Sequence, residues 1–276
     1  MNFESFAEQH GLIIDHIVHD RWTRVPTSDK PHSKNGAYIW DGHSGAVQNW
    51  AMHEKPISFR SQEVIRLSAE EMRQRQEKKR LELERKKHKQ NSAAKRAAHF
   101  MKSAKKKLHP YLISKGFTNH NGERGYVLND MLLIPMSIDY HLVGCQMIMP
   151  DGSKKFMSGQ ITKGAELIMD AGGYNILCEG YATAMSIRRA LKKSDCRYRI
   201  HVCFSASNIL QISAKNPDCI IVADHDTIGI KTAIATGKPY WLSPIEGEDF
   251  NDFELRVGPI EAGKSLIEAG LKVMTE

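Results

Sequence analysis

The sequence predicts an α/β protein of four parts, the last of which is a domain with a parallel sheet and flanking helices. Three observations support this prediction. Apolar strands alternate with helical stretches from Tyr174 onward, which is the pattern of a parallel sheet covered on both faces. Residues 61–107 contain no Pro or Gly and are rich in Glu, Gln, Lys, Arg and Ala, so they predict a long helix. Residues 1–60 and 108–172 show short β-like runs separated by turn residues.

The four parts follow one another along the chain. Residues 1–60 form a small β-rich module with turns at PTSDKP, SKNGAY and WDGHSG. Residues 61–107 form a long basic helical linker, whose few leucines sustain no coiled-coil repeat and which Pro110 ends. Residues 108–172 form a β-rich, mixed α+β subdomain, and residues 173–276 form the C-terminal domain with the parallel sheet.

Composition disfavours several classes of protein. Of the 276 residues, 41% are hydrophobic and 26% are charged, which is typical of a globular chain. The longest apolar run, Met131–Met136, is far shorter than the roughly 20 residues of a membrane span, and the first residues lack the pattern of a secretory signal. The five cysteines form no CxxC pair. We therefore expect no disulfide framework, no cysteine-rich zinc site and a reducing cytoplasm.

The net charge of +7 is concentrated in one segment. Between Glu70 and Lys107 there are 15 Lys or Arg and 5 Glu, a surplus of +10, so the other residues together carry −3. Such a stripe attracts a polyanion such as nucleic acid, with an affinity that falls as the salt concentration rises. A solvated helix that only spaces two domains has the same composition, and the charge alone does not distinguish the two interpretations.

Acidic residues follow three predicted strands of the C-terminal domain. Glu179 follows NILC, Asp224 and Asp226 follow CIIVA, and the segment EDFND follows PYWLS. Ligands of parallel sheets bind beyond the carboxyl ends of the strands. Carboxylates gathered there repel one another, and Mg²⁺ or Mn²⁺ held by a few carboxylates and a substrate phosphate would offset that repulsion. A single Asp at a strand end more often caps the next helix, but three coordinated occurrences favour a site.

These motifs and their order resemble the TOPRIM domain, which bacterial and phage primases share with topoisomerases and some nucleases. The matching segments are CEGYATAMSI from Cys178, ADHD from Ala223 with Gly229 after it, and EDFND from Glu248. Segments further upstream resemble the primases of phages and plasmids in particular. They are HPYLISKG from His109 to Gly116, LLIP from Leu132, and PDGSKKF from Pro150 with Lys163 and Gly164 following. The resemblance covers about residues 108–256.

The resemblance implies a role for each matching residue. The carboxylates that it implies as metal ligands are Glu179, Asp224, Asp226, Asp249 and Asp252. The first three of these are implied as the catalytic residues. Lys155 and Lys163 stand where the lysines of primases contact nucleotide phosphates. One departure is Thr183, because bacterial primases often carry an acidic residue at that position, and Asp252 could substitute for it.

The N-terminal module departs from the zinc ribbon that such primases usually carry, because residues 1–60 contain no cysteine. The segment from Arg24 to Trp50 resembles a zinc-free relative of that module in mobile-element primases, so we expect no zinc. His16 and His19 could ligate a metal, but no second HxxH pair accompanies them. Aromatic and basic side chains of this module could instead stack bases and hold phosphates. The aromatic ones are Trp22, Tyr38, Trp40 and Trp50, and the basic ones are Arg21, Arg24, Lys30 and Lys34. The residues that we expect to bind DNA are Arg21, Trp22, Arg24, Lys34, Trp50, Lys86, Lys87, Lys105, Lys106 and Lys107.

A pattern typical of a phosphate-binding loop occurs near the end of the sequence. GPIEAGKS, from Gly258 to Ser265, fits GxxxxGK[ST]. Such a loop needs a buried strand before it, whereas the preceding DFELRV predicts a short amphipathic helix. We therefore expect no nucleotide-binding loop at this place.

Together these features predict a DNA primase of the phage or plasmid type, acting in DNA replication. It is a DNA-directed RNA polymerase, a nucleotidyltransferase that synthesises short RNA primers on single-stranded DNA with Mg²⁺ or Mn²⁺ as cofactor. The expected partners are single-stranded DNA, nucleoside triphosphates and a separate replicative helicase acting in trans, in the cytoplasm of a bacterial host cell and without a membrane.

Two alternatives remain open. A TOPRIM-type metal-dependent nuclease needs the same acidic residues, but such nucleases lack the β-rich subdomain that carries Lys155 and Lys163. A non-catalytic nucleic-acid-binding protein could use the TOPRIM domain only as a scaffold, and a response to Mg²⁺ or Mn²⁺ that depends on Glu179 would exclude it.

Overall fold

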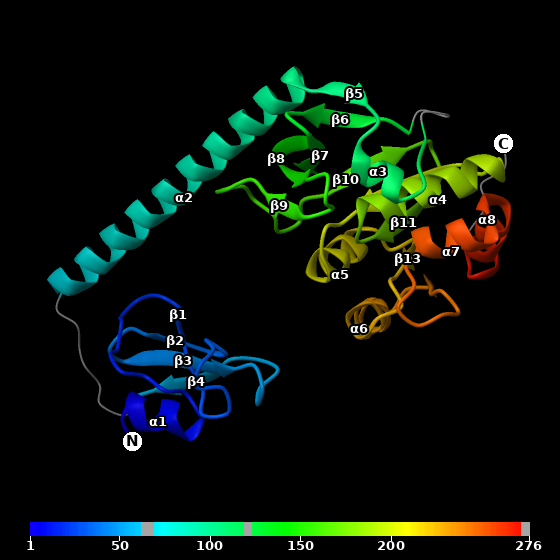
Figure 1. Ribbon diagram of the computed structural model, residues 1–276. Helices are drawn as coiled ribbons and strands as arrows, with labels where there is room; N and C mark the ends of the chain where they lie inside the picture. Colours follow the sequence, from blue (N-terminus) through cyan, green and yellow to red (C-terminus); the bar gives the residue numbers. More distant parts are fainter. Residues whose placement is uncertain (62–68, 119–122, 272–276) are drawn as a thin grey trace. The chain divides into compact units, whose positions relative to one another are not determined.

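The chain forms a mixed α/β structure, as the sequence predicts. The computed structural model describes residues 1–61, 69–118 and 123–271. In these ranges it contains three sheets and eight helices, divided between two compact units, Met1–Arg80 and Leu81–Glu276 (Figure 1). No helix in the described ranges is both long and apolar enough to cross a membrane.

The first unit joins a short helix to a four-stranded antiparallel sheet. The strands, in the same order in the sheet as in the chain, are β1 (Thr23–Val25), β2 (Gly36–Trp40), β3 (Ser44–Asn49) and β4 (Ile57–Arg60). Helix α1 (Phe3–Gln9) is capped by Asn2, whose side chain accepts a hydrogen bond from the backbone N–H of Ser5. The rings of Phe3 and Trp40 stack with their centroids 4.5 Å apart, and Tyr38 is fully buried beside them. An aromatic core therefore holds the helix to the sheet. Tyr38 and Trp40 belong to this core, so the prediction that they stack bases is wrong.

Helix α2 (Ala69–Ser103) ends earlier than the sequence predicts, and residues 62–68 of the predicted linker lie outside the described residues. Composition predicts a helix as far as Lys107, but Lys105–Lys107 forms the edge strand β5, which pairs antiparallel with β6 (Gly125–Leu128). The pairing gives these lysines backbone hydrogen bonds to a neighbouring strand. This tertiary contact outweighs the helix propensity of the three lysines.

The first sheet of the second unit is an antiparallel meander in the order β5-β6-β7-β8-β9. Its remaining strands are β7 (Met131–Ile138), β8 (His141–Ile148) and β9 (Lys154–Phe156). The C-terminal part of α2 packs on one face, where Ala93 and Ala97 meet Leu133. Helix α3 (Pro110–Ser114) packs on the other face, where its Leu112 shares a core with Leu132.

The second sheet has the order β10-β12-β11-β13-β14. Its strands are β10 (Leu167–Asp170), β11 (Tyr174–Cys178), β12 (Tyr198–Val202), β13 (Cys219–Val222) and β14 (Tyr240–Trp241). Strand β11 pairs in parallel with β12 and β13, and β14 pairs in parallel with β13. Strand β10 is an antiparallel edge and comes from the segment that the sequence assigns to the preceding subdomain.

Helices cover both faces of this sheet (Figure 1). One layer contains α4 (Tyr181–Lys193), α7 (Phe250–Val257) and α8 (Pro259–Glu268), and the other contains α5 (Ala206–Lys215) and α6 (Thr227–Thr236). Because side chains alternate along a strand, Ile176 and Cys178 pack in the core below α4, whereas Leu177 packs below α5 and α6.

The pattern GPIEAGKS lies in a helix rather than in a phosphate-binding loop. Helix α8 begins at Pro259 and includes Gly263 and Lys264. A β-carbon on Gly263 would clash with Ser194, and Lys264 pairs with Glu261 on the same helix, with 2.7 Å between Nζ and Oε1. Helix α7 stands where DFELRV predicts an amphipathic helix.

Candidate active site

Four carboxylates lie close together beyond the carboxyl ends of the parallel strands. Glu179 directly follows β11, and Asp224 follows the neighbouring β13 after one residue. Asp226 and Asp249 stand at the starts of α6 and α7. A cavity of about 110 Å³ opens beside Glu179, Asp224 and Asp226.

The pKa of Asp224 is raised to about 6. Burial is the largest cause, and the negative charges of Asp249, Glu179 and Asp226 add to it. Burial and the charge of Asp226 also raise the pKa of Glu179. In the described part of the chain, no donor forms a hydrogen bond with the carboxylate of Glu179 or Asp224. The four carboxylates repel one another. Among the described residues, no hydrogen bond stabilises the charged form of Glu179 or Asp224.

Asp226 and Asp249 also cap helices. Capping is the alternative to a metal site that the sequence analysis left open for such residues. Oδ1 of Asp226 accepts a hydrogen bond from the N–H of Gly229 at 2.6 Å and so caps α6. Asp249 and Asp252 form a reciprocal capping box at the start of α7. Because capping fixes the orientation of each carboxylate, it is compatible with a role for these residues at the acidic edge.

Gly229 allows the α6 turn to approach Asp224 closely. A β-carbon at this position would lie 2.2 Å from the backbone oxygen of Asp224, which is too short for any contact. Only glycine fits there without a shift of the backbone. The glycine after the second acidic motif is therefore needed to place α6 against the loop that carries Asp224 and Asp226.

Two lysines from the preceding β-rich region lie near the acidic cluster. Both stand in segments that resemble primases, but the sequence predicted a site role for neither. The positive charge of Lys154, on β9, lowers the pKa values of both Glu179 and Asp224 against the effect of burial. The Nζ atom of Lys115 lies 3.7 Å from Oδ2 of Asp249 and 3.8 Å from Oδ1 of Asp252. Lys154 and Lys115 come from the part of the chain that forms the antiparallel meander. They therefore lie near carboxylates at the edge of the parallel sheet.

Tyr111 completes this side of the cluster. Its pKa is raised to about 12, chiefly because it is buried and also because Asp249 and Tyr181 lie near it. The ammonium group of Lys154 lies 5.9 Å from the centre of the Tyr111 ring. The neutral ring of Tyr111 thus lies beside Lys154 at the edge of the acidic cluster.

Lys155 and Lys163, the two predicted nucleotide-binding lysines, have different surroundings. On β9, the alternation of side chains separates Lys155 from Lys154 and Phe156, and Lys155 instead contributes to the lowered pKa of Asp151. The ring of Phe156 lies 6.4 Å from that of Phe204, on the side of the second sheet. Lys163 is exposed in the loop between β9 and β10. Their predicted role stays a prediction.

Asn208 fixes the loop that carries Lys163, and no sequence pattern indicated this role. Its Oδ1 accepts a hydrogen bond from the N–H of Gly164 at 2.8 Å. Its Nδ2 donates to the carbonyl oxygens of Thr162, Ala165 and Cys203. This buried amide therefore ties the loop to the start of α5 and the end of β12.

The carboxylate cluster suits a hard divalent cation. Carboxylate oxygens are ligands that Mg²⁺ and Mn²⁺ accept, and a cation would relieve the repulsion that raises the pKa of Asp224. Among the described residues, no three His, Cys, Asp or Glu side chains already converge as a complete metal-binding group. Mg²⁺ commonly takes only one or two carboxylates and completes its coordination with water and substrate phosphates. The residues present fit a cation that binds together with a nucleotide.

The predicted DNA-binding residues of the first unit lie on its surface. Trp22 and Trp50 are 50% and 49% exposed, which is unusual for tryptophan. The guanidinium carbon of Arg24 lies 4.1 Å from the centre of the Trp50 ring. Arg21 and Lys34 are also exposed. These positions are compatible with contact to DNA, which stays a prediction.

The predicted DNA-binding lysines of residues 61–107 separate into two groups. Lys86 lines a cavity of about 420 Å³, together with Arg85 and Lys89 of α2 and with Gly159 of the loop after β9. Lys87 is exposed on α2 but does not line this cavity. Lys105, Lys106 and Lys107 are exposed on the edge strand β5.

Comparisons with known proteins found neither a matching family model nor a matching curated protein sequence. Similar solved structures include a DNA primase domain from Pseudomonas aeruginosa, with 16% identity, a TM-score of 0.35, and coverage of 55% of this chain and 54% of that one. They also include the DnaG primase catalytic domain bound to single-stranded DNA, with 14% identity, a TM-score of 0.37, and coverage of 57% of each chain. The E. coli primase catalytic core has 16% identity and a TM-score of 0.36, over 57% of this chain and 58% of that one. The chain thus spans little more than half the length of these structures.

Proposed function

We propose that this chain is a TOPRIM-type DNA primase, similar to those of phages and plasmids, that synthesises short RNA primers on single-stranded DNA from nucleoside triphosphates. The observation that carries the proposal is the acidic edge of the parallel sheet facing Lys154 of the antiparallel meander. Each of the three acidic motifs contributes to this edge, in the order that the resemblance implies.

The chemistry would be nucleotidyl transfer, in which a 3′-hydroxyl attacks the α-phosphate of a triphosphate and pyrophosphate leaves. Lys154 would hold phosphate oxygens from its side of the site, and Lys155 and Lys163 remain further candidates for this role. Glu179, Asp224, Asp226 and Asp249 would hold Mg²⁺ or Mn²⁺, with Asp252 beside them. When bound, the cation would orient the triphosphate and offset negative charge on the leaving pyrophosphate.

Lys115 would have a different role from Lys154. It lies near Asp249 and Asp252, at less than 4 Å from one oxygen of each. A cation held there lowers the repulsion at this end of the cluster before any ligand binds. We therefore assign Lys115 to holding the acidic edge together and Lys154 to binding the nucleotide.

The remaining partners follow from the same proposal. Trp22 and Trp50 of the first unit would stack template bases, while the basic residues of α2 and β5 would hold backbone phosphates. A separate replicative helicase would supply single-stranded DNA in trans. The setting would be the cytoplasm of a bacterial host cell.

The deciding experiment is a primer-synthesis assay on three proteins: the wild type, Asp224→Asn, and the control Asp139→Asn. Asp139 is an exposed turn residue at a φ of 47°, a conformation that asparagine tolerates. Single-stranded DNA is incubated with labelled nucleoside triphosphates and Mg²⁺ or Mn²⁺, and short products are resolved on a gel. We expect RNA products from the wild type and the control, and none from Asp224→Asn.

The same gel separates the alternatives. Metal-dependent cleavage of the DNA without RNA products would replace the proposal with a TOPRIM-type nuclease. If all three proteins bind DNA equally and none forms or cleaves a strand, the chain is a non-catalytic nucleic-acid-binding protein on a TOPRIM scaffold.

A further inference from the structure

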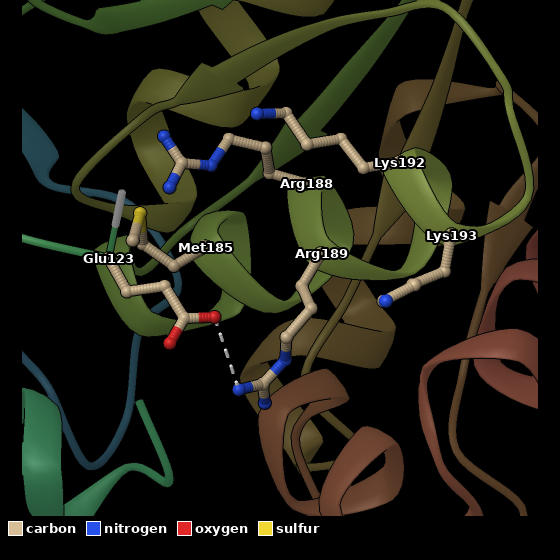
Figure 2. Close-up of a pocket in the computed structure, with 6 residues that line it drawn as sticks. All are labelled: Glu123, Met185, Arg188, Arg189, Lys192 and Lys193. Carbon is tan, nitrogen blue, oxygen red and sulfur yellow. Dashed lines mark ion pairs between the residues drawn. The ribbon is translucent and has the colours of Figure 1, made fainter. Parts of the chain in front are cut away.

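A third cavity, away from the acidic edge, lies beside the C-terminal half of α4. It has a volume of about 280 Å³ and is lined by Glu123, Met185, Arg188, Arg189, Lys192 and Lys193 (Figure 2). Helix α4 begins at Tyr181, next to the acidic motif of Glu179. At 1.5 Å per residue, Lys192 lies about 16 Å further along the helix. We call this cavity the α4 pocket.

Among the described residues, the only carboxylate that lines the α4 pocket is already engaged. Glu123 is buried, accepts a hydrogen bond from the N–H of Thr118 at 2.7 Å, and lies 3.6 Å from Arg189 (Figure 2). Arg189 also forms an ion pair with the buried Glu254 and donates to the carbonyl oxygen of Gly116. The charges of Glu123 and Arg189 are therefore largely balanced within the fold.

Two further lining cations, Lys192 and Lys193, are not balanced in the same way. Lys192 and Lys193 are exposed, and in the ranges that the structure describes no carboxylate lies within 4.0 Å of either amine. The basic side chains also form two like-charge pairs four residues apart, Arg188 with Lys192 and Arg189 with Lys193. Like charges at this spacing destabilise a helix, so the sequence maintains an unfavourable arrangement next to a cavity.

The negative end of the helix dipole explains only part of this arrangement. Lysines in the last turn, such as Lys192 and Lys193, interact favourably with that end of α4. The dipole acts mainly within the last turn, however, and Arg188 and Arg189 lie one turn earlier. It also gives no reason for these side chains to surround a cavity.

We propose that the α4 pocket binds the phosphate groups of a polyphosphate or phosphodiester ligand. The ammonium groups of Lys192 and Lys193 can donate charge-assisted hydrogen bonds to phosphate oxygens, and the arginines of the wall add positive charge beside them. The volume is at the small end for ligand pockets, so it suits two or three phosphate groups rather than a buried nucleoside. The site goes beyond the proposed primase function and does not depend on it.

Pyrophosphate is the probe that tests the pocket, and calorimetric titration into the full chain in the presence of EDTA is the assay. Without divalent cations the acidic edge repels pyrophosphate, so binding there does not interfere. The test variant is Lys192→Gln/Lys193→Gln, which leaves Arg189 and its buried partner in place. The control is Lys231→Gln/Lys264→Gln, which removes two exposed lysines on α6 and α8 of the same unit. Thermal unfolding of both variants checks that each remains folded.

We expect the wild type and the control to bind pyrophosphate alike. The Lys192→Gln/Lys193→Gln variant should bind about tenfold more weakly or worse, because it can no longer form two of the charge-assisted hydrogen bonds to the ligand. No measurable binding by the wild type would overturn the proposal. Equal weakening in the control would also overturn it, because the effect would then come from net charge alone.

A competition experiment identifies the source of the phosphate. If the pocket takes backbone phosphates, a single-stranded oligonucleotide without terminal phosphates will displace pyrophosphate from the wild type. If it takes free polyphosphates, a nucleoside triphosphate will displace pyrophosphate and that oligonucleotide will not. Failure of both competitors would contradict the proposal, since a phosphate site must accept at least one of them.

Discussion

At the scale of single residues, Asp224 combines a cost to folding with a role in the proposed chemistry. Its pKa is raised to about 6 from an ordinary value of 3.8, so the folded state holds its proton more tightly than the unfolded state does. The carboxylate therefore destabilises the fold as the pH rises above 3.8, and the effect is complete above about 6. Residues that weaken the fold in this way are common at functional sites.

We predict that Asp224→Asn raises the unfolding temperature at pH 7 without metal and abolishes primer synthesis. Asparagine removes a charge that three neighbouring carboxylates repel. The gain in unfolding temperature should shrink as the pH falls below 6 and should vanish below about pH 3, where Asp224 is protonated in both the folded and the unfolded state. Thermal unfolding of the variant and the wild type across this pH range measures the effect. A variant less stable than the wild type at pH 7 would mean that Asp224 has a structural role.

Lys154 and Lys155 form a matched pair for testing nucleotide binding. They are adjacent in the chain and both exposed, but only Lys154 acts on Glu179 and Asp224. We predict that Lys154→Gln raises the KM for nucleoside triphosphates or lowers kcat/KM by roughly 10- to 150-fold, as expected for the loss of one charged hydrogen bond of about 1.5–3 kcal/mol. Lys155→Gln should have a clearly smaller effect in the same assay. The reverse ranking would restore the assignment that the family resemblance implies.

At the scale of secondary-structure elements, the sequence predicts the parallel strands well and the orientation of β9 poorly. Apolar runs such as NILC and CIIVA place Glu179 and Asp224 at strand ends, because the last three residues of β11 and all four of β13 are buried. In β9 all three residues are exposed, so no apolar alternation indicates which lysine faces the site. Lys115 lies more than 130 residues before Asp249, and its contact depends on tertiary packing that no local pattern encodes.

Two variants of helix α2 test how its basic residues bind DNA. Either all of them contribute through net charge, or those that line the cavity contribute most. The groove variant replaces Arg85, Lys86 and Lys89 with Gln, and the control replaces Lys87, Lys95 and Lys102. Both remove three positive charges, but only the first three line the cavity between α2 and the loop after β9. We predict that the groove variant binds single-stranded DNA more weakly than the control does, irrespective of template sequence.

The salt dependence of binding measures how many phosphate contacts each variant loses. The slope of log affinity against log salt should become shallower by about 0.7 for each backbone phosphate of a single strand that the protein no longer neutralises. We expect about two units of change in the groove variant and less in the control. Equal changes in the two variants would indicate that the helix acts only through its net charge.

At the scale of the whole molecule, the two compact units divide the proposed tasks. The carboxylates and the lysines that face them all belong to the second unit, whereas the exposed tryptophans belong to the first. Two weak sites on one chain can bind a long template much more tightly than either site alone, because the second contact is intramolecular. Template affinity should therefore depend on both units, and nucleotide affinity on the second unit only.

We predict that Trp22→Ala/Trp50→Ala weakens binding to a long single-stranded template, since each stacked base contributes about 1–3 kcal/mol. The KM for nucleoside triphosphates should stay unchanged at saturating template. Because the variant removes no charge, the slope of log affinity against log salt should also stay unchanged. Tyr140→Asn, which removes an aromatic side chain that is 80% exposed in the second unit, serves as the control and should leave template affinity intact. A raised KM in the tryptophan variant would place the first unit at the nucleotide site, and an unchanged template affinity would remove Trp22 and Trp50 from the DNA-binding surface.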